Sequence, residues 1–155
     1  MPFLTIIPFV AYLLVALLLT RYFTQDSGTH QHKTLANILL LLACVSHAYL
    51  LSDLWQVEGV FFGLASSVSF VAWVVATLLF VTSLSRPIHA LGIIIYPLTA
   101  LALLFSLAFP DTQNKLIEVS IATHVFFSIS AYALLAIAVC QSVLLRSEER
   151  RVGKE

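Results

Sequence analysis

The sequence predicts an all-α protein, a polytopic bundle of transmembrane helices with five spans. Of its 155 residues, 60% are apolar and only 10% are charged, whereas soluble domains average roughly 45–50% and about 25%. Five apolar stretches reach the length of about 17–25 residues that a membrane-spanning helix needs. Because these stretches are continuous and do not alternate with polar residues, they exclude a transmembrane β-barrel.

The expected spans occupy residues 3–23, 35–51, 60–84, 91–109 and 119–145, within one transmembrane domain at 1–146. Turn-forming and charged residues fill the links, as at 25–28, 85–87 and 110–112. The first span has no basic segment before it, so we expect a retained span and not a cleaved signal peptide. Residues 147–155 form a charged tail. This tail resembles read-through sequence seen in environmental assemblies, and we expect it to be non-native.

The basic residues predict the orientation of the bundle in the membrane. Lys115 is the one basic residue in the segments expected outside, and seven basic residues fall on the other side. This distribution places the N-terminus outside and the C-terminus in the cytoplasm. Without residues 146–155, three basic residues remain on the cytoplasmic side against one on the outer side, so the predicted orientation is unchanged. The seven residues are Arg21, Lys33, Arg86, Arg146, Arg150, Arg151 and Lys154.

The formal net charge is zero, with eight basic and eight acidic residues. This balance gives no indication of a nucleic-acid partner. The expected environment is the lipid bilayer. No nucleophile–base pair with an orienting acid, phosphate-binding loop or metal-finger spacing occurs in the sequence, so we do not expect an enzyme.

Two histidines, His47 and His124, lie inside the second and fifth spans. Ionisable residues are rare there, because a charge at the centre of a helix costs at least about 2.5–3.5 kcal/mol. His47 lies four residues before Leu51, and His124 lies five residues after Val119. At 1.5 Å per residue, each lies roughly 6–8 Å below the outer edge of its span. Equal depth in antiparallel spans is what a shared ligand requires.

A narrow polar stripe surrounds the second of these histidines. Ser120, His124, Ser128 and Tyr132 recur every four residues and therefore share one helix face. We expect this stripe to face protein or a cavity, because polar side chains avoid lipid. The third span has a comparable face of small residues, in which the spacing Gly63-x-x-x-Ser67 permits close helix approach.

Each of the two imidazoles also has a plainer interpretation, a buried ring hydrogen-bonded to a neighbouring hydroxyl or carbonyl. The spacing leaves this role and the ligand role open. The lone cysteines, Cys44 and Cys140, are expected to be small buried hydrophobic residues. The remaining histidines are expected in the first cytoplasmic loop or at the cytoplasmic surface: His30, His32 and His89.

The segment Thr123-His124-Val125, followed by Ser128-Ile129-Ser130-Ala131-Tyr132-Ala133, resembles the histidine-bearing helix of the cytochrome c assembly (CcsA-like) family. The family motif reads roughly H-x-x-x-x-x-S-Y-A, and Ala131 replaces the serine before the tyrosine. Ser46-His47-Ala48, and the stretch from Ile94-Ile95-Tyr96-Pro97 to Phe109-Pro110, are similar to a bacterial inner-membrane subgroup of that family. The resemblance covers most of residues 35–145. The family's tryptophan-rich W-W-D segment is absent, and the match corresponds to an N-terminal portion of family members, which usually have six or more spans.

This resemblance implies a protein that holds or moves haem for cytochrome c biogenesis. It implies haem b within the membrane or at its outer face, with His124 and His47 as ligands of the haem iron. Phe126, Phe127 and Tyr49 are candidates to line such a haem. It also implies a multi-pass protein of the bacterial cytoplasmic (inner) membrane, with other cytochrome c biogenesis membrane proteins as partners.

Two alternatives stay open at the level of sequence. One is a permease or transporter subunit whose intramembrane histidines relay protons or contact substrate. The other is an N-terminal fragment that is inactive without further helices or a partner chain.

Overall fold

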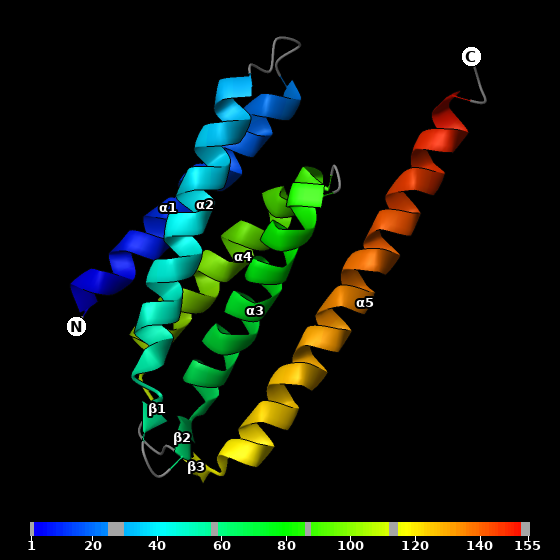
Figure 1. The fold of residues 1–155 in the computed structure, drawn as a ribbon. Coiled ribbons are helices and arrows are strands. Elements are labelled where there is room, and N and C mark those ends of the chain that lie inside the picture. Colours follow the sequence, from blue (N-terminus) through cyan, green and yellow to red (C-terminus); the bar gives the residue numbers. More distant parts are fainter. Residues whose placement is uncertain (1, 25–29, 57–58, 86–87, 112–114, 153–155) are drawn as a thin grey trace.

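A computed structural model describes residues 2–24, 30–56, 59–85, 88–111 and 115–152. Within these ranges the chain forms five long helices (Figure 1). Each is long and apolar enough to cross a membrane, which confirms the five-span, all-α expectation. The helices are α1 (Pro2–Thr24), α2 (His30–Ser52), α3 (Leu64–Ser85), α4 (His89–Ala108) and α5 (Val119–Val152). Residues 25–28, Glu58, Arg86 and the last three residues of the tail, 153–155, lie outside the described ranges.

A small antiparallel sheet, which the sequence did not predict, lies at one end of the bundle, here called the sheet end (Figure 1). Its strands follow the order β1 (Trp55–Gln56), β2 (Gly59–Phe62) and β3 (Lys115–Ile117), with Val60 opposite both Trp55 and Ile117. The third span was expected to start at residue 60, but α3 begins at Leu64. An apolar run next to a span cannot be told from the span by hydropathy, and valine and phenylalanine also favour strands.

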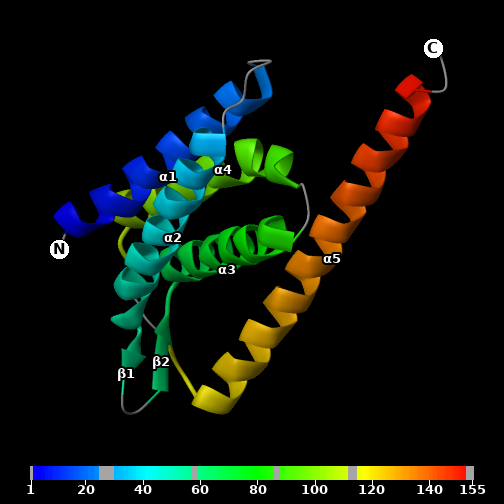
Figure 2. The ribbon, with the colours of Figure 1, turned by 45° about the horizontal axis from the view of Figure 1, so that its top comes forward.

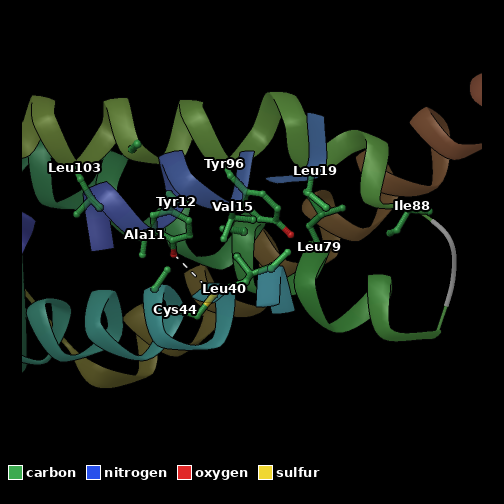
Figure 3. Packing of buried hydrophobic residues seen from close by; sticks show 14 of the residues in the cluster. Ala11, Tyr12, Val15, Leu19, Leu40, Cys44, Leu79, Ile88, Tyr96 and Leu103 are labelled. Atoms are coloured by element: carbon green, nitrogen blue, oxygen red, sulfur yellow. Dashed lines mark hydrogen bonds between the residues drawn. The ribbon is translucent and has the colours of Figure 1, made fainter. Parts of the chain in front are cut away.

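The main core lies where α1 packs between α2 and α4, with part of α3 (Figure 3). Its largest buried side chains include Tyr12, Leu79, Tyr96 and Leu103. Gly92 allows α4 to approach α1 closely, because a Cβ there would lie 2.9 Å from the Leu19 side chain and would overlap the Tyr96 ring. The core therefore holds the first four helices together.

Helix α5 packs mainly along α3 and stands apart from α1, α2 and α4 (Figures 1 and 2). Of the described residues in its apolar window, 11% are buried, against 28–39% in the other four spans. Cys44 of α2 is buried as expected, but Cys140 is exposed, because α5 buries only a small share of its surface. The backbone is helical at His30 and His32, where a loop was expected, and α5 remains helical through residue 152 of the charged tail.

Asp111, in the link after α4, closes the sheet-end terminus of α3. Its carboxylate accepts hydrogen bonds of 2.9 Å from the backbone amides of both Ala65 and Ser66. Partial burial opposes ionisation of this carboxyl, but the amide bonds outweigh burial and hold its pKa below the ordinary value. A Cβ on Gly63 would overlap the carboxylate. Gly63 thus makes room for Asp111, and not for a neighbouring helix as its spacing from Ser67 predicts.

Replacing Asp111 with alanine is expected to lower the free energy of unfolding by about 1 kcal/mol, the usual cost of losing a helix cap. Unfolding in detergent, followed by circular dichroism, measures this loss. Exposed Asp53, near the same end, is the matched control, and Asp53→Ala should leave stability nearly unchanged. Equal losses in the two variants would contradict the capping role.

The same carboxylate predicts a pH dependence. A folded-state pKa below the unfolded value means that the stabilisation is present above the unfolded pKa, about 3.9. It is lost as the pH falls through the lowered folded-state pKa. The stability difference between wild type and Asp111→Ala should therefore be full at pH 7 and shrink on acidification below about pH 4. A difference that stays constant down to pH 2 would contradict it.

Candidate functional site

His47 lies in the last third of α2 and is fully buried. Its Nε2 lies 2.9 Å from the Ser69 hydroxyl of α3, and its Nδ1 lies 3.4 Å from the Tyr12 hydroxyl of α1. A neutral imidazole donates from one nitrogen and accepts at the other, so both partners can be satisfied at once. The ring therefore links three helices, as the plainer of the two sequence interpretations describes.

The contacts of His47 belong to a wider polar cluster inside the bundle. The Tyr12 hydroxyl also donates to the Cys44 sulfur at 3.8 Å, the bond drawn in Figure 3. The Tyr12 ring stacks on Tyr96 of α4, with ring centroids 6.1 Å apart. Trp73 of α3 donates its indole N–H to the Cys44 carbonyl at 2.9 Å. The polar groups of this cluster are thus satisfied within the protein, as a membrane interior requires.

His124 has a different environment, on the exposed side of α5. The face of α5 that packs toward the bundle carries Ala122, Phe126, Ile129 and Ala133. His124 follows Ala122 by two residues, which turns it about 200° around the helix. The prediction that this imidazole and its polar stripe face the interior is therefore wrong for the described chain. Helical periodicity shows which residues share a face, but the larger apolar face of α5 is the one that packs.

The predicted depth of the two histidines agrees with the structure, but their predicted proximity does not. His47 lies five residues before Ser52, the end of α2, and His124 lies five residues after Val119, the start of α5. Both positions are about 7.5 Å from the sheet end of their helices. However, His47 is directed to α1 and α3, and His124 is directed away from the bundle. The described chain does not bring the two rings into one site.

Between these histidines, an aromatic pocket of about 390 Å³ opens at the sheet end. Its walls come from α2, β1, α3 and α5. Neither histidine lines it, although Ala48 follows His47 and Thr123 precedes His124. The lining residues are Ala48, Leu51, Ser52, Trp55, Phe70, Trp73, Thr123, Phe126 and Phe127.

Three polar side chains of this aromatic pocket, those of Ser52, Trp73 and Thr123, are already hydrogen-bonded inside the protein. The hydroxyls of Ser52 and Thr123 donate to carbonyls of their own helices, to Tyr49 at 2.6 Å and to Val119 at 2.7 Å. The Trp73 N–H donates to the backbone of α2. The remaining surface is apolar and largely aromatic. Such a pocket suits a flat, apolar ligand that it holds by stacking and exclusion of water.

The two tryptophans of the chain, Trp55 and Trp73, meet at this pocket, which sequence reasoning missed. They lie 18 residues apart, one in a strand and one in a helix, and only the turn through β1 and β2 brings them together. Phe126 and Phe127, named above as candidates to line a haem, line this pocket. Tyr49 does not line it and is 66% exposed.

The other titratable residues of the described chain form no further cluster. His89, expected at the membrane surface, is buried at the start of α4, and its Nε2 has no hydrogen-bond partner in the described ranges. Those ranges also contain no group of three histidine, cysteine or acidic residues that could hold a metal ion. Comparison of the chain with models of protein families, with curated proteins and with solved structures finds no match.

The role of His47 predicts a specific cost for removing its partner. Ser69→Ala leaves a buried imidazole nitrogen unpaired, so the free energy of unfolding should fall by about 1–3 kcal/mol. Ser46→Ala is the matched control, because the Ser46 hydroxyl bonds only to carbonyls of its own helix. Denaturant unfolding in detergent micelles distinguishes the two. Similar stability of both variants would contradict the structural role of the Ser69–His47 bond.

Proposed function

We propose that this protein binds haem b at the sheet end of the bundle and handles it during cytochrome c biogenesis. The observation that supports the proposal is the aromatic pocket beside α5, the helix whose sequence resembles the histidine-bearing helix of the cytochrome c assembly family. A porphyrin is a flat apolar plate, and the walls formed by Trp55, Trp73 and Phe127 offer the stacking surfaces that such a plate requires.

The two histidines fit this role unequally. His47 does not fit in the described arrangement, because both of its nitrogens are hydrogen-bonded and its side chain has no exposed surface. An axial role for His47 would require it to give up the bond to Ser69. His124 is the more available of the two, because its ring is exposed and has no hydrogen-bond partner among the described residues. Its ring does not line the pocket, so an axial role for His124 requires a haem that extends out of the pocket past Thr123 and Phe127. Imidazole nitrogen is a common axial ligand of haem iron.

Different residues of the chain would therefore have different roles in holding the haem. His124 would hold the iron, and the aromatic walls of the pocket would border the ring and exclude water from it. The bound haem supplies the iron porphyrin that is attached to apocytochrome c. The polar cluster around His47 would keep the α2 and α3 walls of the pocket in place.

The proposed setting follows from charge. The distribution of basic residues favours the sheet end on the outer side, and the family resemblance implies the bacterial cytoplasmic membrane, outside which family members assemble cytochrome c. Other membrane proteins of cytochrome c biogenesis are the proposed partners. A permease role has less support, because the described cavities are lined almost entirely by apolar side chains and offer no polar path.

Haem titration tests both parts of the proposal. Haem bound in the pocket should quench the fluorescence of Trp55 and Trp73, since both line it, and His124 ligation should shift the Soret band. Full-length protein in lipid nanodiscs is titrated with haem while both signals are recorded. His124→Ala should remove the Soret shift, and His124→Met should restore ligation with a different spectrum.

Two controls separate the pocket from the ligand. Ala48→Phe fills the pocket and should weaken tryptophan quenching without touching His124. Iron-free porphyrin should quench equally in wild type and His124→Ala, because it needs no axial ligand. A Soret shift that survives His124→Ala, or haem binding with no quenching of either tryptophan, would contradict the proposal.

A further inference from the structure

The polar stripe of α5 is directed away from the bundle at the depth of the membrane. Ser120, His124 and Tyr132 are exposed, with Tyr132 at 74%, and Ser128 is half-buried. Neither His124 nor Ser128 has a hydrogen-bond partner among the described residues. Ionisable and polar side chains inside a membrane almost always face protein or a water-filled cavity. We therefore expect the stripe to pack against a protein surface.

We propose that this stripe is an interface between two copies of the chain, which pair through α5. The proposal does not depend on haem, because it concerns the haem-free chain, in which neither nitrogen of His124 has a partner among the described residues. Three observations favour a second copy as the occupant: the chemistry of the stripe, its spacing and the small buried share of α5.

The chemistry of the stripe is self-complementary. A two-fold axis along the membrane normal makes the two α5 helices parallel. Each residue then lies at the same depth as the identical residue of the second copy. A neutral imidazole carries one donor and one acceptor, and a hydroxyl carries both. His124 can therefore donate to or accept from His124 of the second copy, and Ser128 can do the same with Ser128. A charged stripe would repel its own copy, and this stripe holds no acidic or basic group other than the histidine.

The spacing of the stripe fits close helix packing. Residues every four positions form a single ridge, on which small serines alternate with the larger His124 and Tyr132. Serines at 120 and 128 are small, and Ala131 lies beside the ridge, so two backbones can approach. In contrast, the groove between α3 and α4 is mostly apolar. Its two hydroxyls, of Ser67 and Thr99, already donate to the backbone carbonyls four residues before them, so no free polar group there distinguishes a protein from a lipid chain.

The packing of α5 leaves this face free. Only 11% of its described apolar window is buried, the smallest share among the five spans, and the ribbon shows nothing of the chain on the side away from α3 (Figures 1 and 2). A second α5 along this face would bury the polar stripe and give the helix a second packing partner.

Disulfide cross-linking in membranes tests the interface. Ser128→Cys is made in a Cys140→Ser background, in which the other cysteine, Cys44, is buried. The chain, without haem, is placed in vesicles of phosphatidylethanolamine and phosphatidylglycerol and oxidised. Leu134→Cys in the same background is the control, because this residue is 44% exposed but lies about 120° around the helix from Ser128. We expect a cross-linked dimer from Ser128→Cys and little from Leu134→Cys.

A second measurement tests the role of the imidazole. His124→Leu should lower the fraction of dimer, with a dimerisation constant about three- to fifteen-fold weaker, the range for a hydrogen bond between membrane helices. Equal cross-linking of the two cysteine variants, or a monomeric mass at all protein-to-lipid ratios, would overturn the interface. Because no haem is present, that result would leave the haem proposal standing, and failure of haem binding would leave the interface standing.

Discussion

The hydrogen bonds of His47 are the interaction on which the arrangement of the first three helices depends. No water in the hydrocarbon core can replace a lost partner, so a polar ring there must be satisfied by protein. Ser69 and Tyr12 supply the two partners. Because these partners come from α3 and α1, the ring fixes the depth of both helices relative to α2. An apolar side chain at this position could pack, but it would not select one depth over another.

This constraint also shapes the candidate site. Leu51 lies one turn after His47 on α2, and Trp73 lies one turn after Ser69 on α3, so the bond and the walls of the aromatic pocket share the same helix faces. The Asp111 cap and the three-stranded sheet hold the same end of α3. The third strand, β3, leads into α5, which forms the remaining wall of the pocket. The pocket is thus a consequence of how α2 and α3 are held together, while His124 remains outside on α5. One histidine is structural in the described chain, and the other is free to meet a ligand or a second chain.

Hydropathy alone was sufficient to predict the five helices, because continuous apolar length is a direct requirement of the bilayer. It also gave the matched depth of His47 and His124. It could not predict β2, because the segment of Val60 is as apolar as the span that follows it. Nor could it predict which face of α5 packs, since both faces satisfy the same periodicity and the outcome depends on neighbours distant in sequence. The pocket could not be predicted from the sequence for the same reason, because Trp55 and Trp73 meet only through the fold of the sheet.

A double-mutant cycle between His47 and Ser69 tests the central constraint most directly. The free energies of unfolding of His47→Phe, Ser69→Ala and the double variant are measured in one detergent. If the two side chains bond as described, the double variant should lose less stability than the sum of the single losses, by about 1 kcal/mol or more. Strictly additive losses would mean that the two residues do not interact, and the arrangement of helices described here would then lack its main polar link.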